Sequence, residues 1–216
     1  MKRIICYNSF NKIKIIKSSV ISLILKNKIY SLLTLSTIVG LIFGALSERL
    51  CCESVVSSLD ILFDSNVKSR IEQPIFATFI ISLTSSFIFI FTLILFGLSI
   101  CGIVFIPLLP FIRGFGVGIT AGYLYSTYYL KGILFNLIVL LPGIFLAMLA
   151  IILEAYESII FSRLLFYNVF FKNKDNDLNN GFKLYIKRSG FIFIISVLSS
   201  FIDVILSLLF LRYFTF

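Results

Sequence analysis

The chain has 216 residues, of which 59% are hydrophobic and only 13% are charged, about half of the charged fraction of a typical soluble domain. Its mean hydropathy is +1.07, and it contains 25 Phe. This is more apolar surface than one core of this length can bury, so most of it must face lipid. These values exclude an ordinary soluble protein and indicate a polytopic membrane protein.

The residue types that most enzymes need are scarce. The chain has no His and four Cys, which removes most routes to a zinc site, a cysteine–histidine nucleophile or a Ser-His-Asp triad. We therefore expect no enzyme, no metal and no cofactor. The net charge of +9 is typical of membrane orientation and contact with anionic lipid, and we do not expect nucleic-acid binding.

The N-terminal segment, 1–28, contains seven basic and no acidic residues. We interpret it as a basic cytoplasmic segment that stays in the mature protein, because its basic region is too long for a signal peptide. The uncharged stretch 29–46 follows. At about 1.5 Å per residue it extends for about 27 Å, which predicts a first transmembrane helix.

The next segment, 47–74, is polar and is expected to form an outer loop with a net charge of −2. Within it, Val55, Leu59, Leu62 and Phe63 fall near helical spacing. This pattern predicts a short amphipathic helix. The helix either lies on the outer leaflet or docks an extracytoplasmic partner.

The rest of the chain contains long uncharged stretches that are interrupted by glycine and proline. We place four further spans at 75–96, 103–126, 132–153 and 190–211. The connection 154–189 is strongly basic, so the positive-inside rule puts it and the N-terminus in the cytoplasm. The sequence thus predicts an all-α, polytopic bundle of about five transmembrane helices, with one transmembrane domain over 29–216.

Three glycines recur every four residues, at Gly114, Gly118 and Gly122. On a helix they form one smooth stripe. In lipid, such a stripe lets another backbone approach closely and gain dispersion contacts. It either packs against a helix of the same chain, joins a second protein or a second copy of this chain, or lines a pore. Gly40 and Gly44 in the first span form a weaker pair that is a natural candidate to face it.

Arg113 is the charge whose depth matters most. If its helix begins near Ile103, Arg113 lies near the membrane midplane, at a cost of about 2.5–3.5 kcal/mol, and needs a carboxylate partner. If the helix begins after Pro110, Arg113 is interfacial. Glu154 and Glu157 share one helical face and are the candidate partners. A structural ion pair, an interfacial position and a proton or ion relay all remain open.

Asp203 lies inside the last predicted span, about 20 Å from its cytoplasmic start. An acidic residue within a membrane helix is a functional-site hypothesis by default. A protonated or hydrogen-bonded structural Asp is the alternative, and Lys131 in an outer turn is a candidate charge partner.

The stretch from Arg113 to Pro142 resembles the stage II sporulation protein M family, integral membrane proteins of endospore-forming bacteria. The resemblance depends on an ordered string of residues: Arg113-Gly114, Val117 to Leu124, Lys131-Gly132 and Pro142. The basic N-terminus and the layout of the first span agree more loosely, and the C-terminal third matches weakly.

This resemblance implies a non-enzymatic membrane scaffold at the mother-cell or septal membrane during forespore engulfment. Its implied partners are cell-wall hydrolases resembling the stage II sporulation proteins D and P, together with membrane lipid. Homo-oligomers also remain open. The alternatives are a small transporter or channel component that uses Arg113, Glu154 and Asp203 in a polar path, or a family-like membrane protein with no sporulation role.

Overall fold

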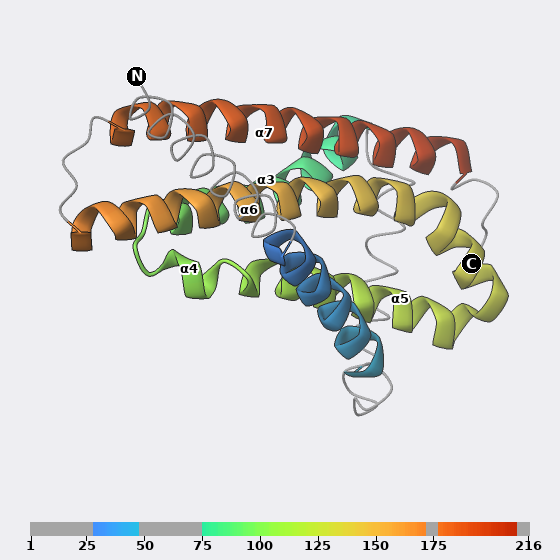
Figure 1. Cartoon of the computed structure of the whole chain (residues 1–216). Coiled ribbons are helices and arrows are strands. Elements are labelled where there is room, and N and C mark those ends of the chain that lie inside the picture. The colour runs from blue at the N-terminus through green and yellow to red at the C-terminus, as the bar shows by residue number, and fades with distance from the viewer. Residues whose placement is uncertain (1–27, 48–74, 172–176, 211–216) are drawn as a thin grey trace, which may run out of the picture.

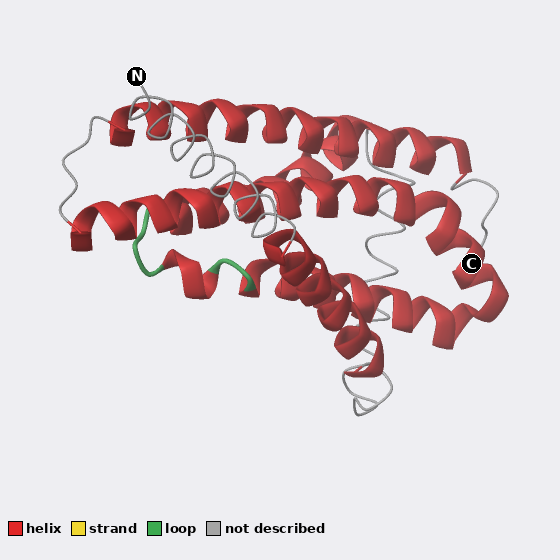
Figure 2. Ribbon diagram, in the orientation of Figure 1, coloured by secondary structure: helices red, strands yellow, loops and turns green. Residues whose placement is uncertain are grey.

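The computed structural model of the chain describes residues 28–47, 75–171 and 177–210, and its regular elements there are helices (Figure 2). The first is Lys28–Ser47, which we call the N-terminal helix. It is followed by α3 (Ile75–Gly97), α4 (Gly102–Phe105), α5 (Leu108–Phe135), the π-helix η1 (Asn136–Leu140), α6 (Leu141–Phe171) and α7 (Asp177–Phe210). The expected all-α fold is confirmed.

Two of the sequence predictions fall outside the described residues. These are the basic segment up to residue 27 and the outer-loop helix carrying Val55, Leu59, Leu62 and Phe63. Both stay predictions.

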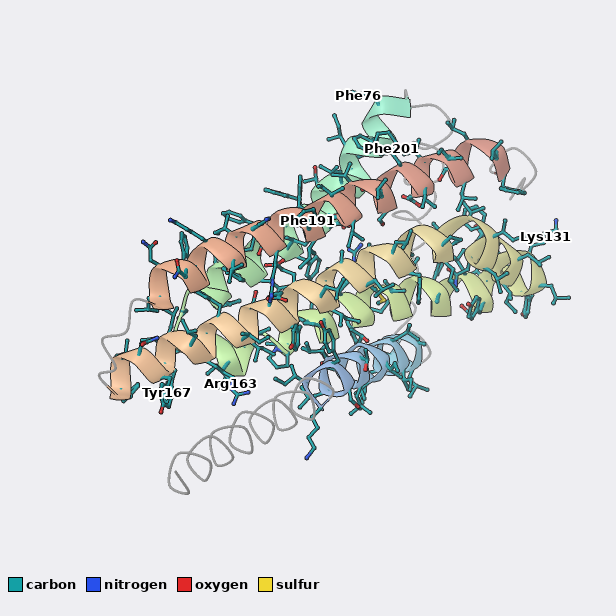
Figure 3. The ribbon with its side chains drawn as sticks, turned by 45° about the horizontal axis from the view of Figure 1, so that its top comes forward. Phe76, Lys131, Arg163, Tyr167, Phe191 and Phe201 are labelled. Atoms are coloured by element: carbon teal, nitrogen blue, oxygen red, sulfur yellow. The ribbon has the colours of Figure 1, made fainter. Side chains whose placement is uncertain are left out.

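The bundle exposes apolar side chains and buries polar ones. Phe76, Phe191 and Phe201 lie on its outside (Figure 3) and are each more than half exposed. In contrast, the hydroxyls of Ser158 and Ser196 are fully buried. A soluble protein has the opposite distribution, whereas helices in lipid bring small and polar residues to their contacts. The exposed surface is therefore one that lipid can cover.

Among the described residues, four helical runs are long and apolar enough to cross a membrane: Lys28–Ser47, Phe79–Gly97, Gly102–Phe170 and Leu178–Phe210. The sequence prediction of five separate transmembrane helices is corrected to four helical runs, one of which is bent. The spans expected at 103–126 and 132–153 belong to one run of 69 residues, because no loop separates them. The chain reverses direction within the helical run itself.

The reversal joins α5 and α6 as antiparallel arms (Figure 1), with Lys131 at its tip (Figure 3). Tyr129 has a φ of 47° and a ψ of −125°, which is not helical. Gly132 allows the arms to meet, since a Cβ there would collide with the carbonyl oxygen of Leu124. Across the bend, the Asn136 side-chain amide donates to the Tyr125 hydroxyl at 2.7 Å.

The helices α6 and α7 are the longest, with 31 and 34 residues, or about 47 and 51 Å. A hydrocarbon core is about 30 Å thick, so one end of each helix can extend beyond it. The connection expected at 154–189 is accordingly mostly helical. Residues 154–171 contain no Gly or Pro that would end α6 where its charged residues begin.

The N-terminal helix crosses α5 on the outside of the bundle (Figure 1). Its first half is fixed by Leu33, which is fully buried, and by Tyr30, whose ring stacks on that of Tyr156 at 4.0 Å between centroids. Ser36 donates a hydrogen bond to the carbonyl oxygen of Pro107 at 2.8 Å. These contacts set the second half of the helix, which carries Gly40 and Gly44, against α5.

Candidate functional site

The two glycine pairs meet at the crossing of the N-terminal helix and α5. A Cβ on Gly40 would lie 3.1 Å from the backbone nitrogen of Phe115 and closer still to the carbonyl oxygen of Phe111. From the other side, a Cβ on Gly118 would lie 2.9 Å from the backbone nitrogen of Ala45 and would collide with the carbonyl oxygen of Leu41. The two backbones are thus in direct contact.

Gly44 and Gly114 complete this contact, because a Cβ on either would collide with a carbonyl oxygen of the opposite helix. Gly122 lies one turn beyond Gly118 and is half-buried. The structure therefore places Gly114 and Gly118 against a helix of the same chain, and that helix covers this part of the stripe.

A cavity of about 360 Å³ lies between α3, α5, α6 and α7, and most of its exposed wall is apolar. We call it the polar cavity because of the polar side chains that it contains. Eight polar side chains line it: Ser82, Ser85, Ser86, Arg113, Thr120, Ser199, Ser200 and Asp203. Small and apolar residues of η1 and α6 complete the wall, among them Leu140, Gly143 and Ala147. A cavity of this size falls within the range of small-molecule sites.

Arg113 reaches this cavity from the second turn of α5. Its Nη1 donates to the Ser85 hydroxyl at 2.8 Å, and its guanidinium lies over the ring of Phe89, 5.3 Å from the ring centroid. Its Nε is buried and has no hydrogen-bond partner among the described residues. The helix α5 begins at Leu108, before Pro110, and Arg113 is half-buried.

Glu154 and Glu157, the candidate partners of Arg113, lie outside the cavity. Gly143 of α6 faces the cavity together with Arg113, and Glu154 follows it by 11 residues, or about 16 Å along the helix. The two glutamates are therefore too far along α6 to reach the guanidinium.

Asp203 reaches the same cavity from α7. It accepts a hydrogen bond from the Ser82 hydroxyl at 2.5 Å. Ser82 and Ser85 are one turn apart on α3, so α3 binds the carboxyl of Asp203 with one turn and the guanidinium of Arg113 with the next. Lys131, the partner considered for Asp203, lies at the bend between the arms (Figure 3).

Close helix packing brings Asp203 to this position. A Cβ on Gly143 would lie 2.9 Å from the Cβ of Asp203 and 3.2 Å from its Cα. The Ser199 hydroxyl donates to the carbonyl oxygen of Gly143 at 2.7 Å. The absence of a side chain at Gly143 therefore lets α6 and α7 approach at the cavity wall.

Glu154 belongs to a separate polar cluster. Its side chain is fully buried between α6 and α7 and accepts from the Ser189 hydroxyl at 2.8 Å. Nearby, the hydroxyls of Ser158 and Tyr185 share a hydrogen bond of 3.0 Å, and the Tyr185 ring stacks on that of Phe161, with 4.7 Å between centroids. A single polar path through Arg113, Glu154 and Asp203 would have to connect the cavity with this second cluster.

Glu157, one turn beyond Glu154, points away from the cluster. It forms an ion pair with Arg188 of α7 at 2.9 Å. The two glutamates thus have different surroundings, although both contribute to the contact between α6 and α7.

The serines that line the cavity were missed in the sequence analysis. Ser82, Ser85 and Ser86 have the i, i+3, i+4 spacing of one helical face, in a helix without charged residues. In α7, Ser199 and Ser200 precede Asp203 by four and three residues, so they lie one turn from it on the same face. Two polar faces of this kind are a signal that could have located the cavity.

The described residues contain no group of three or more His, Cys, Asp or Glu side chains that could hold a metal ion. A search for curated relatives and a search for similar solved structures each found no match. A family model described as stage II sporulation protein M matches residues 30–208. This range runs from the N-terminal helix almost to the end of α7, and it confirms the resemblance that the glycine region indicated. The chain is a multi-pass membrane protein that belongs to the stage II sporulation protein M family.

Proposed function

We propose that this protein is a non-enzymatic membrane scaffold that anchors peptidoglycan-degrading partners at the septal membrane during forespore engulfment. The observation that carries the proposal is the family match over residues 30–208. The partners are cell-wall hydrolases resembling the stage II sporulation proteins D and P. The scaffold positions them, and the hydrolases carry the chemistry.

The partners act on the cell wall, so they must be reached from outside the cytoplasm. Four basic residues of the described chain lie in the second half of α6 and the first half of α7, at Arg163, Lys183, Lys187 and Arg188. By the positive-inside rule these parts of the two helices and the N-terminus are cytoplasmic. The segment 47–74 is then extracytoplasmic, and the apolar residues at helical spacing in its sequence dock the partners.

Recovery of partners tests the scaffold. Tagged protein is solubilised from sporulating cells, with and without cross-linking, and the bound proteins are identified. We expect wild-type protein to recover a cell-wall hydrolase and the doubly substituted Leu59→Glu, Phe63→Glu variant to lose it. Arg163→Gln is the control, because Arg163 is an exposed residue at the opposite end. Recovery of no hydrolase by wild-type protein in either condition would reject the scaffold.

The proposed orientation has its own test in the native cysteines Cys51 and Cys52 of the outer loop. An impermeant thiol reagent applied to intact cells should label them. Protection in intact cells, with labelling after lysis, would place the loop in the cytoplasm and remove the proposed docking surface.

The polar cavity favours a second candidate, a small transporter. Arg113 and Asp203 line one chamber inside the bundle, and intramembrane charges often mark substrate pathways. Flux of small ions and polar solutes into proteoliposomes separates the candidates, since a scaffold gives no flux above the lipid background.

A further inference from the structure

The guanidinium of Arg113 has more hydrogen-bond donors than the protein satisfies. Arginine carries five N–H donors, and the hydrogen bond to Ser85 uses one of them. Its Nε is buried without a hydrogen-bond partner among the described residues. The carboxyl of Asp203 lies on the same cavity and balances part of the charge of the guanidinium, but a buried donor without an acceptor remains unfavourable. The cavity therefore offers an unused guanidinium donor to an oxygen atom of a ligand.

The size of the cavity is compatible with a small ligand. Its volume of about 360 Å³ falls within the range of small-molecule sites, so a lipid headgroup is small enough to enter.

The cavity opens toward lipid between α3 and α5. Ile81 and Ile112 line it and are 52% and 45% exposed on the outside of the bundle. Gly116 of α5 also lines the cavity and is exposed, and a Cβ there would meet nothing within 4 Å. Hydrocarbon chains can lie over the two isoleucines while a headgroup reaches inward past Gly116.

The other polar groups complete the chemistry of the ligand. Ser86, Thr120, Ser199 and Ser200 offer hydroxyls, and Asp203 offers a carboxyl, all on the same cavity. These groups suit a headgroup that carries hydroxyl or amine groups beside its phosphate. The guanidinium is well matched to a phosphate oxygen pair.

We propose that this cavity binds the phosphodiester headgroup of a membrane phospholipid, with the phosphate on Arg113 and the acyl chains between α3 and α5. The site is independent of the scaffold role, so either proposal can fail alone.

Native mass spectrometry of the full chain in a neutral detergent tests the proposal. The probes are phosphatidylglycerol, phosphatidylethanolamine, dioleoylglycerol and inorganic phosphate. We expect a one-to-one complex with at least one phospholipid and none with dioleoylglycerol, which has the chains but no phosphate. Equal retention of dioleoylglycerol would overturn the assignment to Arg113. Inorganic phosphate that binds alone and displaces the phospholipid would show a free-anion site and overturn the lipid assignment.

Two substitutions locate the complex. Arg113→Gln should weaken phospholipid retention about tenfold, the loss expected for charge-assisted hydrogen bonds, while the exposed Arg163→Gln should not change it. Gly116→Leu retains the guanidinium but fills the mouth, and it should weaken retention by a similar factor. The matched control is Gly190→Leu, because Gly190 also has open space around it but does not line the cavity. Unchanged retention in Gly116→Leu would overturn the proposed entry, even if Arg113→Gln does not fold.

Discussion

Two faces of α5 carry glycines with opposite surroundings. Gly118 faces the N-terminal helix, where a Cβ would collide with the carbonyl oxygen of Leu41. Gly116, half a turn away, faces the mouth of the polar cavity, where a Cβ would meet nothing within 4 Å. A glycine in a membrane helix therefore lets a neighbouring helix approach closely where one lies beside it. Where no helix lies beside it, the missing side chain leaves open space.

The two faces also use different interactions. Where the N-terminal helix crosses α5, backbone meets backbone through the glycine pairs, so dispersion and weak Cα–H···O contacts supply the attraction. The cavity is lined by hydroxyls and by the charged Arg113 and Asp203. We infer that the first face assembles the bundle and the second is available to a ligand.

The largest loss of stability is expected from Gly118→Leu, which acts where the N-terminal helix contacts α5. Overpacking a core that can adjust costs about 1–3 kcal/mol. The leucine side chain would cost more, because it would separate two backbones that are in contact. We expect a destabilisation of about 3 kcal/mol or more, or a loss of folded protein. Thermal unfolding in detergent, followed by circular dichroism, and cellular abundance are the measurements. Gly190→Leu controls for the added leucine, and a Gly118→Leu variant as stable as this control would contradict the closed contact.

An intermediate effect is expected from Gly143→Ala, where α6 meets Asp203. Alanine in place of glycine inside a helix is normally favourable by about 0.5–1 kcal/mol. Here the new Cβ would lie 2.9 Å from that of Asp203, so α6 and α7 must shift apart. We expect a net destabilisation of about 1–2 kcal/mol.

Gly181→Ala is the matched control for that substitution. A Cβ on Gly181 would meet the Leu164 methyl groups at 3.5 and 3.8 Å, which is ordinary packing. This variant should be as stable as the wild type or more stable, in the same unfolding experiment. If both alanine variants are stabilised, the approach of α6 and α7 at the cavity wall is looser than the structure describes.

The glycine contact was partly predictable from the sequence, and the partner of Arg113 was not. A spacing of four residues puts Gly114 and Gly118 on one face of any helix, and Gly40 and Gly44 have the same spacing. The surroundings of Arg113 depend instead on how α3 and α7 are rotated and shifted against α5. Hydropathy contains no information about that rotation, so charge alone could not identify the neighbours of Arg113.

The number of separate helical runs was mispredicted for a related reason. Hydropathy reports which residues can lie in lipid, whereas a helix ends only where a breaker or a cap interrupts it. The stretch around Lys131 contains a charge but no non-helical loop, and a single non-helical residue, Tyr129, accompanies the reversal. The helix α6 likewise continues past Glu154, because a helix can leave the membrane without ending.

A small loss of stability is expected from Arg188→Gln, because Arg188, unlike Arg113, lies at the exposed surface of the bundle. Arg188 has its carboxylate, Glu157, at 2.9 Å, but its side chain is 56% exposed. Pairs this exposed contribute about 0.2–1 kcal/mol, so the variant should lose no more than that. A double-mutant cycle with Glu157→Gln measures the pair itself. A coupling well above this range would show that the pair is buried when the protein is in lipid.

The smallest effect on stability is expected from Gly116→Leu, two residues from the most damaging substitution. Because a Cβ at Gly116 meets nothing within 4 Å, the side chain can extend into the mouth of the cavity without moving a helix. Leucine is also the better helix former by up to about 1 kcal/mol. The unfolding transition should therefore stay at the wild-type position or rise slightly. A loss comparable to that of Gly118→Leu would mean that both faces of α5 are closed. Stability with reduced phospholipid retention would mean that one helix face holds the bundle together while the other admits a ligand.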